Sequence, residues 1–197
     1  MNQMQALHLI RESTALRMQE ILDLGISRYM LYALRDSGAL EHIGRGIYRV
    51  SDESTLEYPD LVSVAIRHPK AVICLISALS FHELTTQIPH VVSIAIPRGG
   101  YAPQMDFPPV EVRRFSPDSY REGIEIHTFD SIDVQIYNPE KTIVDCFRFR
   151  NQIGMDVVLE ALKRYRASGT FNHQQILHYA QVCRVQNIIT PYLLALL

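Results

Sequence analysis

Arginine and hydroxyl side chains near the start of the chain have types and a spacing that suit nucleic-acid binding. Arg28, Tyr32 and Arg35 follow one another at intervals of four and three residues, so on a helix they would lie on the same side. The planar guanidinium fork suits phosphate oxygens and guanine edges, and serine or tyrosine hydroxyls can add contacts to the DNA backbone. The candidate DNA contacts are Arg17, Ser27, Arg28, Tyr29, Tyr32, Arg35, Arg45 and Arg49.

A winged helix-turn-helix would bring these side chains together. A short helical pattern begins at Leu16, and Gly25 can adopt the positive φ that ends this helix and turns the chain sharply. Ser27 then caps a second helix over residues 28–37, and Gly38 stops it. The apolar side of this second helix would pack inward, which leaves its arginine and tyrosine side free to enter the major groove of DNA.

A hairpin follows the second helix and would form the wing. Residues 40–43 and 47–50 are short strand patterns joined by a glycine-flanked turn, with Arg45 at its tip. We expect Arg45 and Arg49 to touch the DNA backbone from this wing, and Arg17 to clamp a further phosphate. The alternative is a small helical subdomain whose arginines simply face water.

Charge excludes a purely electrostatic nucleic-acid binder. The formal net charge is −2, so the chain as a whole does not attract DNA, and any binding must come from local basic patches. A second basic face is predicted in the last third of the chain, where the alternative is a solvated helix surface. Its residues are Lys141, Arg148, Arg150, Lys163, Arg164 and Arg166.

The cellular compartment is indicated by the N-terminal residues, the absence of a long apolar run and the cysteines. The sequence has no run of 18 or more apolar residues, and Arg11 and Glu12 stand where a signal peptide would carry its apolar centre. Cys74, Cys146 and Cys183 lie far apart among apolar neighbours, which predicts buried free thiols. We therefore expect a soluble, cytoplasmic protein.

Two domains and an α+β fold are predicted. Residues 51–59 are polar and lack periodicity, so we place the domain boundary after residue 54. The first domain, residues 1–54, is the winged helix-turn-helix, and the second, residues 55–197, is a mixed α+β domain with a helical tail. A sheet of about four strands is expected from the β-rich residues 91–96, 110–115, 124–129 and 134–137.

Helical patterns account for much of the second domain. Asn138 caps a helix that we expect to run to about residue 150. Within this helix, Asp145 is spaced to form a structural ion pair with Lys141 or Arg148. The other expected helices cover residues 60–68, the second part of 71–84, 154–167, 173–183 and 186–196, with Pro191 as a candidate start of the last.

The residues that could perform catalysis do not form a complete set. Arg98, Gly99 and Gly100 follow a predicted strand, and their backbone amides could cradle a phosphate as in nucleotidyltransferases. Such enzymes also need paired metal-binding carboxylates, whereas Asp106 stands alone. We therefore expect no enzymatic activity, no metal and no other cofactor. An enzyme built on this loop is the alternative.

Several segments together resemble the AbiEi family, the antitoxin half of bacterial type IV toxin–antitoxin systems linked to phage defence. The resemblance spans nearly the whole chain, and the shared order of its segments is more specific than any single motif. It is carried by residues 24–27 and 44–49 in the first domain and by residues 72–84, 139–148 and 159–162 in the second.

The resemblance implies a DNA-binding antitoxin. Its winged helix would bind operator DNA and repress its own operon, and its second domain would counter a nucleotidyltransferase-like toxin encoded beside it without a stable complex being required. We expect two copies on an inverted repeat, because one winged helix makes few contacts. The alternatives are a protein-interaction module and a stand-alone transcriptional regulator without a toxin partner.

Overall fold

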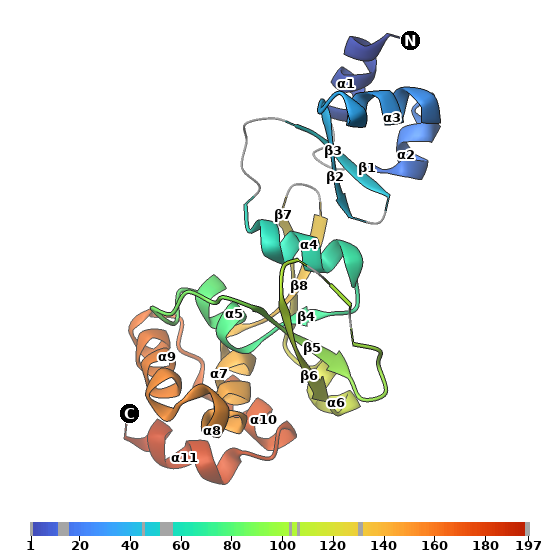
Figure 1. Ribbon diagram of the computed structural model, residues 1–197. Helices are drawn as coiled ribbons and strands as arrows, with labels where there is room; N and C mark the ends of the chain where they lie inside the picture. Colours follow the sequence, from blue (N-terminus) through green and yellow to red (C-terminus); the bar gives the residue numbers. More distant parts are fainter. Residues whose placement is uncertain are drawn as a thin grey trace. The chain divides into compact units, whose positions relative to one another are not determined.

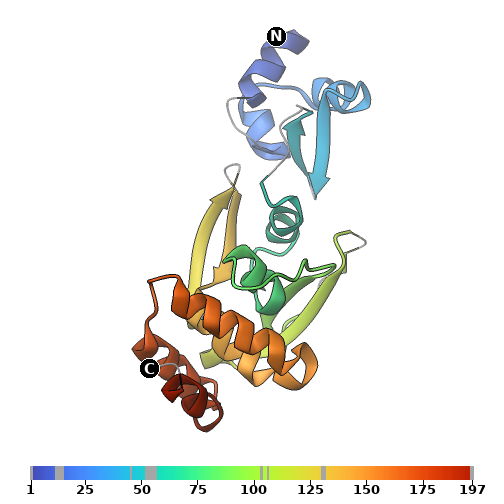
Figure 2. The ribbon, with the colours of Figure 1, turned by 90° about the vertical axis from the view of Figure 1, so that its left-hand side faces the viewer.

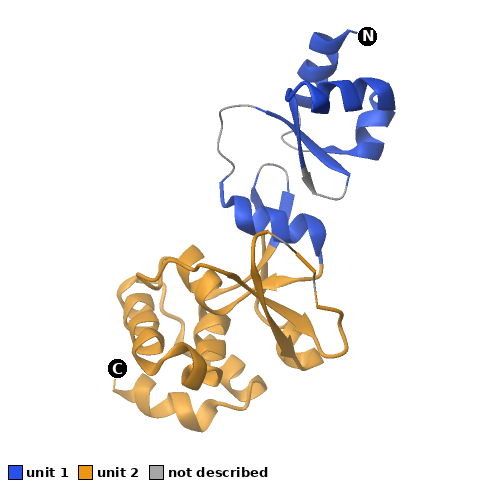
Figure 3. Ribbon diagram, viewed as in Figure 1, with its two compact units in different colours: residues 1–69, 127–134 blue, residues 70–126, 135–197 orange. Residues whose placement is uncertain are grey.

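The chain forms two compact units, which are described separately here. The first comprises Met1–Pro69 with His127–Val134, and the second comprises Lys70–Ile126 with Gln135–Leu197 (Figure 3). The predicted boundary after residue 54 falls outside the described residues and stays a prediction. The computed structural model (Figure 1) describes residues 2–11, 16–44, 46–51, 57–102, 104–105, 107–129 and 132–195.

The N-terminal unit combines short helices with a three-stranded antiparallel sheet. Its strand order is β1-β3-β2, with Leu16 opposite Tyr48 and Glu41 opposite Arg49. The strand β1 was not predicted, because two residues are too short to show an alternating pattern. The elements are α1 (Gln3–Arg11), β1 (Leu16–Arg17), α2 (Met18–Asp23), α3 (Arg28–Asp36), β2 (Leu40–Gly44), β3 (Ile47–Val50) and α4 (Pro59–Arg67).

A small apolar core joins the first three helices to this sheet. Leu31 and Leu34, three residues apart on α3, are buried as the sequence predicted. The helix α1, which sequence analysis did not identify, adds Ala6 and Ile10 from its own inner side. The cluster consists of Ala6, Ile10, Ile21, Ile26, Leu31, Leu34, Leu40 and Tyr48.

The second unit is built on a mixed five-stranded sheet of order β6-β5-β4-β8-β7. β4 pairs antiparallel with β5 and parallel with β8, and β5 pairs parallel with β6. The strands are β4 (Val72–Ile73), β5 (Val92–Pro97), β6 (Val110–Phe115), β7 (Ile124–Phe129) and β8 (Ile132–Tyr137). The helices are α5 (Leu75–Phe81), α6 (Pro117–Arg121), α7 (Pro139–Arg148), α8 (Arg150–Ile153), α9 (Met155–Ala167), α10 (His173–Val182) and α11 (Gln186–Leu194).

Two predicted helix boundaries differ from those of the structure. The helix capped by Asn138 ends at Arg148 rather than near residue 150, and the short helix α8 follows it. Pro191 lies inside α11 and does not start it, because the amides of Ile188 and Ile189 already donate to the carbonyl oxygen of Val185. None of the described helices combines the length and the apolar character needed to cross a bilayer.

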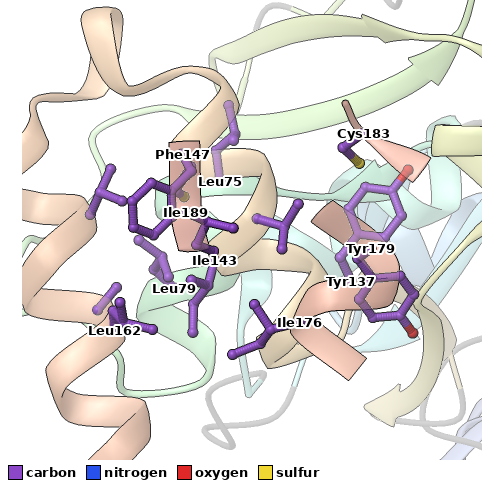
Figure 4. Close-up of a cluster of buried hydrophobic side chains, with 14 of the residues drawn as sticks. Leu75, Leu79, Tyr137, Ile143, Phe147, Leu162, Ile176, Tyr179, Cys183 and Ile189 are labelled. Carbon is purple, nitrogen blue, oxygen red and sulfur yellow. The ribbon is translucent and has the colours of Figure 1, made fainter. Parts of the chain in front are cut away.

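Helix α7 lies at the centre of the second unit. It contacts α5, α9, α10 and α11, and the helices α7 to α11 gather on one side of the sheet (Figure 2). Figure 4 shows its Ile143 and Phe147 among side chains of these neighbouring helices. Residues 141–147 are all buried, so α7 has no solvated side along this stretch.

A buried ion pair on α7 confirms the predicted structural role of Asp145. The Lys141 Nζ atom donates to Asp145 Oδ2, and both side chains are fully buried. The same ammonium lies 4.2 Å from the centre of the Tyr137 ring and 4.9 Å from that of Phe115. Burial raises the pKa of the Asp145 carboxyl, and the Lys141 ammonium opposes this shift.

The three cysteines are buried free thiols, as predicted. Burial raises the pKa of the Cys74 and Cys146 thiols, which keeps them protonated and unreactive. Cys183 adds a contact to the buried ion pair, since its Sγ atom lies 3.6 Å from Asp145 Oδ1. All three side chains therefore serve the packing of the second unit.

Replacing Lys141 with methionine should destabilise the second unit, because Asp145 would stay buried without its partner. Breaking a buried ion pair in this way costs about 3–5 kcal/mol. The double variant Lys141→Met/Asp145→Leu buries no charge, so we expect it to lose less stability than either single variant. Urea unfolding followed by circular dichroism measures the free energies of unfolding of Lys141→Met, Asp145→Leu and the double variant. Additive losses would contradict the pairing.

Candidate nucleic-acid interface

The direction of α3 is set by the turn that joins it to α2. The amide of Gly25 donates to the carbonyl oxygen of Leu22 at 2.9 Å, and the amide of Ile26 donates to that of Ile21 at 3.3 Å. Gly25 has φ +81°, which confirms its predicted role. These two bonds and the left-handed residue form the Schellman arrangement, and the buried Ile21 and Ile26 belong to one apolar cluster.

Both ends of α3 are fixed by local chemistry. The Ser27 side chain accepts a hydrogen bond from the Met30 amide at 3.2 Å, which confirms the predicted cap. At the other end Gly38 has φ +77°, and its amide donates to the carbonyl oxygen of Arg35. The helix therefore starts and stops at residues that the sequence specifies.

The outer side of α3 presents a polar and aromatic surface. Ser27 and Arg28 are exposed, and the Tyr29 side chain is among the most exposed large side chains, at 84%. Tyr32 is 38% exposed and lies one turn further along the same side. This surface offers hydrogen-bond donors and aromatic faces on a helix that is packed on its other side.

Arg35 lies on this surface but is held by its neighbours. Its Nε and Nη2 atoms donate to Asp36 Oδ1 at 2.8 and 2.6 Å, and its guanidinium lies 4.9 Å from the centre of the Tyr32 ring. The hydrogen bond to Asp36 raises the pKa of Arg35. Sequence analysis missed this acid, although its position directly after Arg35 was a visible signal.

The strands β2 and β3 hold a second acid-bound arginine. Arg49 donates from Nε and Nη2 to Glu41 Oε2 at 2.8 and 2.7 Å, across the antiparallel register of β2 and β3. Glu41 was also missed, although the register of the predicted hairpin would have placed it opposite Arg49. Arg17 is exposed on β1, opposite Ile47. Arg45 lies outside the described residues.

The predicted second basic face does not exist as one surface. Lys141 is fully buried in its ion pair, because α7 is surrounded by other elements. Arg148 and Arg150 are half-buried and donate inward, to the Ser119 hydroxyl and the Phe147 carbonyl oxygen. The part exposed to solvent on α9 is limited to Lys163, Arg164 and Arg166.

Around the predicted loop, the described residues bring together no cluster of candidate metal ligands. Arg98 and Gly99 are exposed and follow β5, while Asp106 lies outside the described residues. In the part of the chain that the structure describes, no three histidine, cysteine, aspartate or glutamate side chains gather as metal ligands would. The outer side of α3 therefore remains the candidate interface.

Replacing Gly25 with alanine should destabilise the N-terminal unit by about 1–2 kcal/mol, because an L-residue at this φ is strained. No described residue places a heavy atom within 4 Å of an added Cβ, so the loss comes from the backbone and not from a clash. Gly25→Asn is the matched control and should lose less, since asparagine tolerates this conformation. Thermal unfolding measures both. An equal loss in the two variants would contradict this account of the turn.

Comparisons with known proteins agree with the N-terminal geometry. Residues 4–51 match a family described as "Transcriptional regulator, AbiEi antitoxin", which is a family of regulators and not of enzymes. No curated protein matches the chain. The crystal structure of the RV2827C protein from Mycobacterium tuberculosis has a similar fold, with a TM-score of 0.57 and 14% identity over 86% of this chain and 67% of that chain. The predicted resemblance to the AbiEi family is thus confirmed over residues 4–51, the part of the chain that matches this family's model.

Proposed function

We propose that residues 2–51 form a winged helix-turn-helix and that the protein is a sequence-specific DNA-binding transcriptional regulator. The observation that carries this proposal is the outer side of α3, where Arg28, Tyr29 and Tyr32 face solvent. The order of three helices and a three-stranded antiparallel sheet supports it. The match of residues 4–51 to a family of transcriptional regulators supports it independently.

The dimensions of α3 suit the major groove. An α-helix with its side chains is about 10–12 Å in diameter, and the major groove is about 12 Å wide. The first turn carries Ser27, Arg28 and Tyr29, where the positive end of the helix dipole also attracts phosphate. We assign base contacts to Arg28, Tyr32 and Arg35, and backbone contacts to the hydroxyl groups beside them.

The wing and β1 supply sequence-independent contacts in this proposal. Arg45 and Arg49 would touch phosphates from the β2–β3 hairpin, and Arg17 would clamp a phosphate from β1. The net charge of −2 makes such local contacts necessary, because the whole chain does not attract DNA. Arg45 should contribute equally to the affinity for all DNA sequences.

Two copies of the chain on an inverted repeat are the expected complex. One α3 covers a single half-site, and specific affinity requires more contacts than one helix supplies. The exposed side of α9, with Lys163, Arg164 and Arg166, would assist the assembly of the two copies on DNA. A footprint of two half-sites about one helical turn apart would support this arrangement, and a single half-site would contradict it.

The antitoxin activity is proposed from the family description alone. The matched family contains antitoxins as well as regulators, so we propose that the chain represses its own operon and opposes a nucleotidyltransferase-like toxin. The second unit would carry the opposition to the toxin. Stable co-purification of the chain with a neighbouring gene product would instead favour a protein-interaction module.

Fluorescence anisotropy of the full chain on its own upstream duplex and on a scrambled duplex tests the proposed function. We expect the upstream duplex to bind more tightly at a fixed salt concentration. Arg28→Ala should reduce the discrimination between the two duplexes by about 1–3 kcal/mol, because a bidentate base contact is lost.

The control for Arg28→Ala is Arg121→Ala, which removes the same charge from an exposed position on α6 of the second unit. We expect this variant to bind both duplexes like the natural chain. Equal effects of the two substitutions, or equal binding of the two duplexes by the natural chain, would contradict the proposed interface.

A further inference from the structure

Two arginines of the proposed DNA interface are held by acids in the same way. Arg35 donates from Nε and Nη2 to one oxygen of Asp36, and Arg49 donates from Nε and Nη2 to one oxygen of Glu41. All four distances lie between 2.6 and 2.8 Å. The Nε/Nη2 edge of each guanidinium, which could otherwise bind two acceptors of DNA, is therefore already occupied by a carboxylate.

Arginine–carboxylate pairs of the second unit are arranged differently. Arg113 reaches Glu111 through Nη2 at 2.6 Å, while its buried Nε has no partner among the described residues. Arg164 reaches Glu160 through Nε alone at 2.9 Å. The two-nitrogen arrangement is thus a feature that the pairs of α3 and the wing share.

Arg28 differs from Arg35 and Arg49 in its electrostatic surroundings. It is exposed at the start of α3, and no carboxylate of the described residues forms an ion pair with it. Its full charge is available to any phosphate, whereas Arg35 and Arg49 bring compensating negative charges with them. Among the described residues of the proposed interface, Arg28 therefore differs from Arg35 and Arg49, whose attraction to DNA is reduced by a neighbouring carboxylate.

We propose that Asp36 and Glu41 are specificity determinants of this interface, an inference that rests on the proposed function. To turn toward DNA, each arginine gives up two hydrogen bonds to its acid. At the correct site, Arg35 meets the O6 and N7 atoms of guanine, and Arg49 meets phosphate oxygens that come into register only when α3 is seated on its own sequence. Each pair of acceptors replaces both hydrogen bonds.

A mismatched site replaces only one of these hydrogen bonds, and the released carboxylate then repels the phosphates around it. The acids consequently lower affinity for generic DNA more than for the correct site. The Arg35–Asp36 pair is exposed, and exposed ion pairs contribute little to stability, so giving up this pair costs the fold little.

The test measures binding of Asp36→Asn and Glu41→Gln to the upstream and scrambled duplexes by anisotropy over a range of salt concentrations. We expect each substitution to raise affinity for the scrambled duplex about threefold or more, which is the effect of one added phosphate contact. The slope of log affinity against log salt should steepen by about 0.9. Affinity for the upstream duplex should rise less, so the ratio of the two affinities falls.

The matched control is Glu111→Gln, which removes the same charge and the same kind of partner from Arg113 in the second unit. It should leave both affinities and the salt slope unchanged. If Asp36→Asn and Glu41→Gln behave like Glu111→Gln, or raise both affinities equally, the inference is overturned while the proposed function stands. If the natural chain binds neither duplex, or both equally, the proposed function fails and the inference fails with it.

Discussion

The turn between α2 and α3 is the constraint on which the proposed interface depends. One left-handed glycine, Gly25, lets the chain reverse within a few residues, and the buried Ile26 after it joins the core. The cap at Ser27 then fixes where α3 begins. Because Leu31 and Leu34 are buried on one side of α3, Arg28 and Tyr32 must face outward on the other. The outer surface is thus a direct consequence of packing on the inner one.

The second unit contains a fully buried ion pair. Lys141 and Asp145 satisfy each other within α7, and the rings of Phe115 and Tyr137 lie close to the ammonium. Gly123 is needed here as well, because a Cβ at this position would lie 2.6 Å from Lys141 Cβ. Removing one partner would leave an uncompensated buried charge. The packing of α7 against its neighbours therefore depends on both members of the pair.

Features set by local chemistry could be predicted from the sequence. The caps at Ser27 and Asn138 and the turn at Gly25 depend on a few adjacent residues, and the structure confirms them. The strand β4 could not be predicted, because Val72 and Ile73 are a strand only through pairing with β5 and β8. The sheet therefore has five strands and not four.

The prediction of a second basic face was wrong for a related reason. Counting charges along the chain assumes that each one reaches solvent, whereas α7 is buried on all sides over residues 141–147. Burial of this kind depends on four other helices that are distant in sequence. The partners of the interface arginines were missed for a simpler reason, since Glu41 becomes visible only when the hairpin register is applied to Arg49.

The central claim is that the outer side of α3 binds duplex DNA. Titration of the ¹⁵N-labelled full chain with its upstream duplex, followed by amide chemical shifts, tests this claim most directly. The account predicts that the largest changes lie in residues 27–35 and 46–49, and that amides of α10 and α11 change little. Changes confined to residues 163–166, or no changes at saturating DNA, would contradict it.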